Sequence, residues 1–401
     1  MSRASIRFRK AWTTIRQRGL IRGLRHSATI WVADQLRVDP EVFQELAFVY
    51  GEDRPPTLRP SNKEDLVLNW VIPPFSIGSG GHQTMFTTIA ELDRRGHTNR
   101  VYIVGAGEAD AKLSTKIARQ FYAPIRSDIE VFRQELPDSD ILVATSWETA
   151  YRVRTIANTA RKAYFVQDLE YKFFPEGGVR DLARETYRWG FFGITAGDWI
   201  AEILSKQFGM PSSPFHFWYD QTLYSLREST ASRPRILYYA RPRTPRRGFE
   251  LGLLALGLVA QRHPEVDVVM VGMTPTSTAL PFKATYPGVL PAAKLPGVYA
   301  NATAALVLSH TNLSLVPLEL MACGCPVVSN RGPNVEWMLN SSNCALADPR
   351  PESLAEELVQ IIEDSSRRKK LVESGLAFAA STSLTAEIDK IETAFRCALM
   401  P

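Results

Sequence analysis

Short apolar runs alternate with amphipathic segments along this chain, and this alternation constrains its fold more than any other feature. The apolar runs are 66–72, 101–104, 141–144, 163–166 and 191–194 in a first series, and 236–239, 266–271, 304–308 and 326–328 in a second. Short apolar strands separated by helices are typical of parallel sheets covered on both faces. The sequence therefore predicts an α/β protein with two doubly wound domains, residues 63–226 and 227–381, whose ligand lies beyond the carboxyl ends of the strands.

The first 62 residues differ from the rest, and they predict a basic helical segment followed by a proline-containing linker. Residues 1–37 hold nine basic residues and one acidic residue, so their net charge of +8 exceeds the +5 of the whole chain. Two interpretations stay open for residues 1–49: a helix on an anionic membrane surface, or a solvated helix packed on its own protein. Because the positive charge is confined to one segment, a nucleic-acid-binding surface is not expected.

The composition predicts a cytoplasmic protein, peripheral on the inner face of the cell membrane if the basic segment binds there. The residues are 45% hydrophobic and 22% charged, and no apolar run reaches the ~18 residues that a spanning helix needs. The N-terminus lacks the apolar core and cleavage site of a signal peptide. The spacing of the four cysteines fits no zinc site, so buried reduced thiols are expected and no metal is predicted.

The run from Ser309 to Asn330 carries the strongest functional signal. A predicted strand ends at Ser309, a polar turn follows, and a helix begins near Leu315. Exposed backbone N–H groups at a helix start attract phosphate. The candidate nucleotide contacts are therefore Asn312, Leu313, Ser314 and Leu315. Glu319, one turn into the helix, could accept hydrogen bonds from sugar hydroxyls, although helix starts of this kind are common in proteins without such a site.

The second part of this run, Pro317 to Val328, resembles the donor-site signature of family-four GT-B glycosyltransferases. That signature has two glutamates eight positions apart, then an alanine-rich helix, a glycine, a proline and a valine pair. Glu319 matches the second glutamate, which binds the nucleotide ribose in that family, whereas Thr311 stands where the first is expected. The resemblance implies a GT-B fold, with both domains facing a central cleft and a C-terminal helix at 382–401 returning to the N-terminal domain.

A basic loop follows the first predicted strand of the second domain. In the family, an arginine and a lysine five residues later bind the donor diphosphate, and Arg241 and Arg246 have this spacing with arginine at the second position. Arg247 is a further candidate phosphate contact. Cations on a pyrophosphate can neutralise the charge that develops on the leaving group, so we expect Arg241 and Arg246 to act in catalysis without a metal. The alternative is a solvated basic loop.

A glycine-rich turn follows the first predicted strand of the first domain. Gly80 and Gly81 allow a ligand to approach the backbone closely, and in the family a glycine pair at this place faces the cleft. His82 is a candidate for substrate contact or proton transfer, and a helix-capping histidine is the equal alternative. Gln167, Asp168 and Glu170 follow another strand toward the same cleft, which makes them candidate acceptor contacts or ordinary polar loop residues.

Within the family, the similarity is greatest to rhamnosyltransferases that build bacterial rhamnan and related surface glycans. This similarity implies a dTDP-rhamnose donor, a glycan or lipid-linked glycan acceptor, and retention of the anomeric configuration. A different UDP- or GDP-sugar donor stays open, as do two other classes of protein. One is a nucleotide-sugar epimerase, which the small number of histidines (6) disfavours. The other is a non-catalytic glycan-binding protein, which Thr311 favours.

Overall fold

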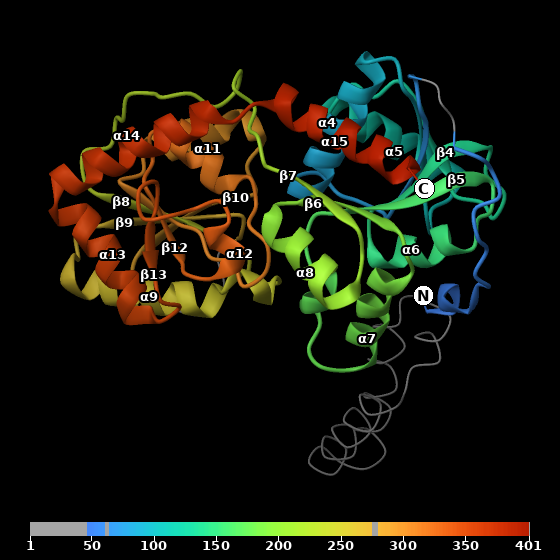
Figure 1. Cartoon of the computed structure of the whole chain (residues 1–401). Helices are drawn as coiled ribbons and strands as arrows, with labels where there is room; N and C mark the ends of the chain where they lie inside the picture. The colour runs from blue at the N-terminus through green and yellow to red at the C-terminus, as the bar shows by residue number, and fades with distance from the viewer. Residues whose placement is uncertain (1–45, 61–63, 275–279, 401) are drawn as a thin grey trace, which may run out of the picture. The chain divides into compact units, whose positions relative to one another are not determined.

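The computed structural model describes residues 46–60, 64–274 and 280–400. The chain divides into two compact units, residues 1–50 and 51–401. In the first unit the described part is a short 3-10 helix, η1 (Ala47–Tyr50), so nearly all of the predicted basic segment lies outside the described residues. The second unit contains both of the predicted α/β domains (Figure 1).

The first domain is built on a seven-stranded sheet in which every neighbouring pair is parallel. The strand order is β3-β2-β1-β4-β5-β6-β7. The strands are β1 (Val67–Ile72), β2 (Thr98–Ile103), β3 (Ile129–Val131), β4 (Ser139–Ala144), β5 (Thr159–Val166), β6 (Phe192–Ala196) and β7 (Ser212–Phe215). The helices are α4 (Gly80–Arg94), α5 (Glu108–Phe121), α6 (Trp147–Arg154), η2 (Glu170–Phe173), α7 (Gly178–Glu185), η3 (Thr186–Arg188) and α8 (Asp198–Phe208).

The second domain repeats the arrangement with a six-stranded parallel sheet, in the order β10-β9-β8-β11-β12-β13. Its strands are β8 (Arg235–Tyr239), β9 (Asp267–Val271), β10 (Ala284–Gly288), β11 (Ala304–Leu306), β12 (Val327–Asn330) and β13 (Ala345–Ala347). Its helices are η4 (Pro245–Arg247), α9 (Phe249–Arg262), η5 (Ala292–Lys294), α10 (Leu295–Ala300), α11 (Val316–Ala322), α12 (Pro333–Glu336), α13 (Pro351–Glu363) and α14 (Ser365–Ser381). The two predicted parallel-sheet domains are thereby confirmed.

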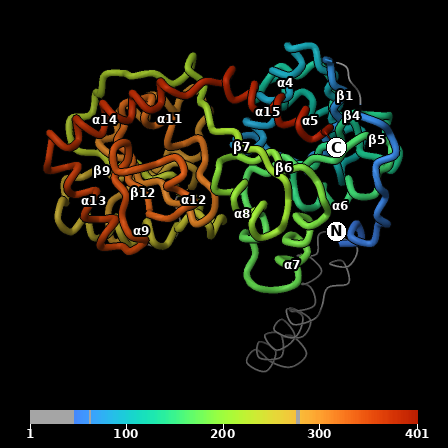
Figure 2. Tube along the Cα trace, viewed as in Figure 1, coloured from blue at the N-terminus to red at the C-terminus, as the bar shows by residue number. Residues whose placement is uncertain are grey.

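The last helix, α15 (Leu384–Leu399), follows α14 and packs on β5, β6 and β7 of the first sheet. Figure 2 shows this red end of the chain beside α4. The side chain of Arg95 pairs with Glu392 at 2.9 Å, and the backbone N–H of His216 donates to Glu387 at 2.6 Å. We call residues 64–218 with α15 the N-lobe, and residues 235–381 the C-lobe.

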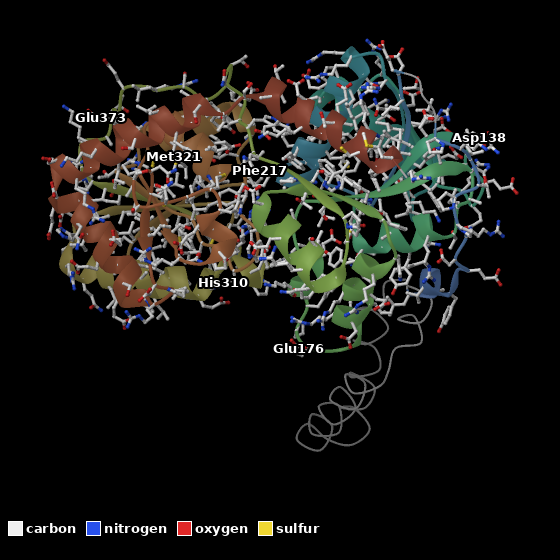
Figure 3. The ribbon with its side chains drawn as sticks, in the orientation of Figure 1. Asp138, Glu176, Phe217, His310, Met321 and Glu373 are labelled. Carbon is white, nitrogen blue, oxygen red and sulfur yellow. The ribbon has the colours of Figure 1, made fainter. Side chains whose placement is uncertain are left out.

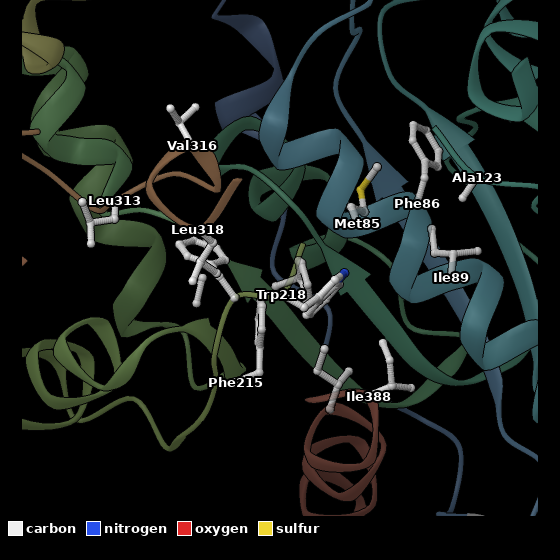
Figure 4. Close-up of a cluster of buried hydrophobic side chains, with 14 of the residues drawn as sticks. Met85, Phe86, Ile89, Ala123, Phe215, Trp218, Leu313, Val316, Leu318 and Ile388 are labelled. Carbon is white, nitrogen blue, oxygen red and sulfur yellow. The ribbon is translucent and has the colours of Figure 1, made fainter. Parts of the chain in front are cut away.

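One apolar cluster draws side chains from both lobes. Figure 4 shows Phe86 of α4, Phe215 at the end of β7, Leu318 of α11 and Ile388 of α15 in this cluster. Burial of apolar side chains is the main source of folding stability. The lobes are therefore joined by packed core and not by a linker alone.

Four strands that the sequence did not predict are the edge strands of the two sheets: β3, β7, β10 and β13. Proline lies within β7 and β10, and the side chains of β10 alternate between half-buried and exposed. An edge strand has one unpaired side, so it tolerates proline and needs fewer apolar residues than a central strand. The central strands, which are buried on both faces, were all found from their apolar runs.

The segment predicted as a linker is bound to the N-lobe where the structure describes it. The backbone N–H groups of Arg54 and Thr57 donate to the carbonyls of Arg154 and Ala157, at 3.1 and 3.0 Å. The buried ammonium of Lys162 donates to the carbonyls of Arg54 and Arg154. Residues 51–60 are therefore part of the lobe surface, since their backbone groups are used in specific hydrogen bonds.

Candidate functional site

The loops that leave the carboxyl ends of the two sheets meet at Asp168, which follows β5. Its carboxylate accepts the hydroxyl of Thr311 at 2.7 Å and the backbone N–H of Asn312 at 2.9 Å, both after β11. The amide of Asn312 donates to the carbonyls of Gln167 at 2.9 Å and Ala196 at 2.7 Å. Ligands of doubly wound sheets bind at this carboxyl edge, so the candidate site lies here.

The loop 309–315 is held in shape by three asparagines. Asn330 and Ser309 exchange two hydrogen bonds, of 2.8 and 2.9 Å. The Asn334 amide donates to the carbonyls of Ser309 at 2.8 Å and Thr311 at 2.6 Å. The side chain of Asn312 is fully buried and accepts the indole N–H of Trp337 at 2.9 Å. A loop with its polar groups satisfied in this way presents its remaining backbone groups in one fixed arrangement.

Trp337 fills the space between this loop and the N-lobe. A Cβ atom at Gly197 would lie 2.8 Å from the indole ring, so only glycine allows the ring to sit there. Phe217, labelled in Figure 3, also packs against Trp337, with the two ring centroids 5.6 Å apart. No pattern in the sequence indicated that Trp337 packs between this loop and the N-lobe.

The loop between β8 and α9 holds four arginines, of which Arg241, Arg246 and Arg247 are the candidate phosphate contacts. Arg247 donates to the Ser309 hydroxyl at 2.7 Å and to the Asn312 carbonyl at 3.0 Å, and burial lowers its pKa to about 10. The guanidinium of Arg246 lies 3.8 Å from the ring centroid of Phe173, with its Nε atom 3.7 Å from Asp168 Oδ2. Arg241 lies over the ring of Tyr239 at 4.6 Å.

These arginines divide into two groups by what they contact. Arg247 is committed to the loop 309–315, whereas Arg241 and Arg246 rest on aromatic rings that leave guanidinium N–H groups for a ligand. Burial lowers the pKa of Arg246, and the nearby carboxylates of Asp168 and Glu170 oppose that change. Arg246 and Arg247 stay protonated at neutral pH. The structure therefore gathers three cations at the carboxyl edge of the C-lobe.

Glu319 lies in the first turn of α11 and is partly exposed. Its carboxylate accepts the hydroxyl of Tyr299 at 3.3 Å and a second hydrogen bond from Tyr224. The two tyrosine rings stack with centroids 6.0 Å apart. Burial raises the pKa of Glu319 to about 7, and the two tyrosine hydrogen bonds oppose that rise. Neither tyrosine was found from the sequence, since they come from distant segments, between β7 and β8 and from α10.

The glycine-rich turn leads into α4 as expected. Its helix begins at Gly80, and the ring of His82 stacks on Phe75 with centroids 5.0 Å apart. The His82 Nδ1 atom lies 2.8 Å from the Ser79 hydroxyl. Burial lowers the pKa of His82 to about 4, so its imidazole is neutral at pH 7. A pocket at this turn is lined by Pro74, Phe75, Ser76, Ser79 and His82.

The other predicted acceptor residues separate in space. Gln167 donates from its side chain to the Gly81 carbonyl at 2.9 Å and so links the loop after β5 to the start of α4. Glu170 turns inward, where it accepts the backbone N–H of Trp147 and the hydroxyl of Tyr164. Burial and the neighbouring Glu148 raise the pKa of Glu170 to about 8. Glu148 was not predicted, because a single glutamate at a helix start carries no distinctive pattern.

Residues 46–60, 64–274 and 280–400 contain no group of three or more His, Cys, Asp or Glu side chains placed to hold a metal ion. In the same ranges no helix has both the length and the apolarity to cross a membrane. All four cysteines are free thiols; Cys323, Cys325 and Cys344 are buried as expected, whereas Cys397 is half-buried.

Comparisons with known proteins identify the architecture. Residues 234–359 match the family model described as WsaF, C-terminal domain. The O-antigen biosynthesis protein RfbC of Myxococcus xanthus is 31% identical over 335 residues, which cover 80% of this chain but only 26% of RfbC. HepE of Anabaena, in complex with UDP and glucose, superposes with a TM-score of 0.65 at 16% identity, over 83% of this chain and 100% of HepE.

The chain has the GT-B glycosyltransferase fold. Sucrose-phosphate synthase from Thermosynechococcus elongatus gives a TM-score of 0.62 at 13% identity, over 82% of this chain and 98% of the synthase. At such identities the structural matches establish the fold alone. The GT-B fold explains why the candidate groups collect where the carboxyl edges of both sheets meet, since each lobe contributes the loops from the middle of its own sheet.

Proposed function

We propose that this protein is a glycosyltransferase that moves L-rhamnose from dTDP-rhamnose onto a bacterial surface-glycan acceptor. The observation that carries this proposal is the arrangement of Arg241, Arg246 and Glu319 at one edge of the C-lobe. Support for a role in surface-glycan synthesis comes from the likeness to RfbC, an O-antigen biosynthesis protein. Support for a nucleotide-sugar donor comes from HepE, which has this fold and binds UDP and glucose.

In the proposed complex, the nucleotide diphosphate lies against the C-lobe. Arg241 and Arg246 pair with the phosphates, and the backbone N–H groups of residues 313–315 face them at the start of α11. Glu319 accepts the ribose hydroxyls. Because a carboxylate has about four lone-pair sites, the two tyrosines that bind Glu319 orient it and leave acceptor capacity for the ribose.

The chemistry proposed is departure of the nucleoside diphosphate as an acceptor hydroxyl attacks the anomeric carbon, with retention of configuration. The two arginines stabilise the charge on the leaving diphosphate, so no metal is required. The acceptor approaches from the N-lobe, past the neutral imidazole of His82 and the amide of Gln167. Glu170 does not contact the acceptor in this proposal. Its carboxyl accepts the backbone N–H of Trp147, the first residue of α6, and so supports this surface from the interior.

A ligand panel tests the proposed donor. Bound ligand stabilises the folded state in proportion to the logarithm of ligand excess over Kd. Thermal unfolding with dTDP, UDP and GDP should show the largest rise in Tm for dTDP, and the rise should be lost in Arg241→Ala but kept in Arg243→Ala. Arg243 is an exposed arginine of the same loop and therefore a matched control. Equal shifts for the three nucleotides would refute the dTDP assignment, and no shift with any of them would refute the donor site.

A second experiment separates the transferase from the other two classes. Incubation with dTDP-rhamnose alone and then with added glycan acceptor should release dTDP mainly in the second case. Conversion of the sugar without acceptor would instead indicate an epimerase. Absence of nucleotide release under both conditions, with every donor in the panel, would indicate a non-catalytic glycan-binding protein.

The basic N-terminal segment is proposed as the membrane contact of a cytoplasmic enzyme. Its net charge of +8 over residues 1–37 suits an anionic surface. A chain that lacks residues 1–49 should lose binding to vesicles of phosphatidylglycerol while it keeps its affinity for nucleotide. Unaltered vesicle binding by the shortened chain would exclude this role.

A further inference from the structure

The first glutamate of the resembling donor signature is absent from this chain, and a carboxylate from the other lobe stands beside its position. Thr311, eight residues before Glu319, occupies the glutamate position. Its side-chain hydroxyl donates to Asp168 Oδ2 at 2.7 Å. Thr311 is almost fully buried, and 13% of the Asp168 side chain is exposed. The Asp168 carboxylate therefore lies next to the Thr311 side chain and remains slightly exposed.

A glutamate at position 311 and the hydrogen-bonded pair of Thr311 and Asp168 would place a carboxylate oxygen at similar distances from the Cβ atom of residue 311. By standard bond lengths, an extended glutamate carries a carboxylate oxygen roughly 3.5 Å beyond its Cβ atom. A threonine hydroxyl that bonds an acceptor oxygen at 2.7 Å covers nearly the same distance from Cβ. Thr311 and Asp168 together thus place a carboxylate oxygen at about the distance from the Cβ atom of residue 311 that a glutamate at 311 would reach. The two differ in origin, because the negative charge of Asp168 belongs to the N-lobe, whereas a glutamate at 311 would belong to the C-lobe.

Both carboxylate oxygens of Asp168 accept hydrogen bonds, and little of the side chain is exposed. Its second oxygen accepts the backbone N–H groups of Asn312 and Leu169, at 2.9 and 2.8 Å. Arg246 Nε lies 3.7 Å away, and this nitrogen has no hydrogen-bond partner in the structure. Burial raises the pKa of Asp168, and Arg247, the Asn312 N–H, Thr311 and Arg246 all oppose that rise. The ionised carboxylate is therefore stabilised by the same arginine loop that faces the donor.

We propose that Asp168 is a positioning residue that supplies, from the N-lobe, the carboxylate that the donor signature otherwise carries at position 311. It holds the start of the loop 309–315 and turns Arg246 toward the diphosphate. Because the carboxylate and its partners belong to different lobes, the donor site is complete only when the loops after β5 and β11 are in contact. This inference rests on the proposed function, and it revises the expectation that Asp168 contacts the acceptor.

An exchange of the carboxylate between the lobes tests the proposal. Asp168→Ala removes the carboxylate, and misplacement of the donor loop should lower kcat with dTDP-rhamnose by roughly 100-fold. Thr311→Glu alone should also lose activity, since two carboxylates would then share one place. The double variant Asp168→Ala/Thr311→Glu should recover kcat to well above either single variant. Recovery of this kind does not follow from a purely structural contact between the lobes.

The isosteric variant Asp168→Asn keeps the proposal testable if the alanine variant fails to fold. Its Tm should stay within a few degrees of the wild type, while its kcat falls and its KM for the donor changes less. Asp138→Ala, a change of an exposed aspartate in the same lobe, should alter neither quantity. A kcat for Asp168→Asn equal to that of the wild type would overturn the proposal, as would a folded double variant no more active than Asp168→Ala.

Failure of the proposed function would be distinct from failure of this inference. If the wild type neither binds dTDP, UDP or GDP nor turns over a nucleotide-sugar, the transferase function fails and the role of Asp168 fails with it. If the wild type binds and transfers while the Asp168 variants behave like the wild type, the role of Asp168 alone is refuted.

Discussion

The two lobes share one topology, yet their strand-end loops carry opposite chemistry. At the carboxyl edge of the C-lobe stand three arginines, a helix start and the carboxylate of Glu319. At the same edge of the N-lobe stand aromatic rings, the neutral His82 and the amide of Gln167. A diphosphate needs cations and N–H donors, whereas sugar hydroxyls need neutral partners and apolar faces. Topology thus determines where ligands bind, and loop composition determines which ligand each edge can hold.

The largest effect on the C-lobe side is expected from Arg247→Ala. This buried guanidinium binds the Ser309 hydroxyl and the Asn312 carbonyl, and its loss leaves buried polar groups without partners. We expect a loss of about 2–4 kcal/mol in the free energy of unfolding. Urea denaturation measures this, with Arg243→Ala as control. If the two variants prove equally stable, Arg247 does not hold the loop 309–315.

The next effect is on ligand binding, and it should differ between the lobes: a C-lobe variant should weaken nucleotide binding and an N-lobe variant should weaken acceptor binding. Arg241→Ala should weaken nucleotide binding about 10- to 100-fold, since a charge-assisted hydrogen bond contributes roughly 1.5–3 kcal/mol. His82→Ala should raise the KM for the acceptor and leave the nucleotide Kd unchanged. Isothermal titration with dTDP and steady-state kinetics measure the two quantities. The assignment of nucleotide to the C-lobe and acceptor to the N-lobe would be wrong if His82→Ala weakened dTDP binding as much as Arg241→Ala does.

A smaller effect is expected in the pH dependence of donor affinity. Since the pKa of Glu319 is about 7, the carboxylate is half protonated near neutral pH in the free protein. The phosphates of a nucleotide-sugar are diesters and keep their charge, so affinity should rise up to about tenfold from pH 6 to pH 8 as Glu319 ionises. In Glu319→Gln the profile should be flat. A wild-type affinity that falls over this range would contradict the ribose assignment.

The last effect concerns the N-lobe alone. Glu170 has an ordinary pKa of 4.5, and the folded protein raises it to about 8. A carboxyl with a raised folded-state pKa is favourable when protonated, so its ionisation reduces stability as pH rises from about 4.5 through 8. Glu170→Gln should therefore gain more stability relative to the wild type at pH 8 than at pH 5. Thermal unfolding at both pH values measures this, and a loss at pH 8 would show that the ionised group is favourable.

The structure shows which parts of this protein can be predicted from local pattern. The central strands were found because runs of apolar residues report burial on both faces of a sheet. The edge strand β7 was not found, because Pro214 and two serines give it no such pattern. Among the candidate site residues, Arg246 and Glu319 were predicted from the resemblance to the donor signature. Tyr224, Tyr299 and Glu148 were not, since each lies far in sequence from the group that it contacts.

The sequence by itself determined two parallel α/β domains, the basic loop after β8 and the helix start that carries Glu319, because each is a property of one short segment. Only the tertiary structure decided what these groups bind. It joined Asp168 to Thr311 across 143 positions of chain and placed two tyrosines on Glu319. It also committed Arg247 to the loop 309–315 while leaving Arg241 and Arg246 on aromatic rings. Hydrogen bonds between distant loops depend on how the lobes pack, and no local pattern of residues encodes that packing.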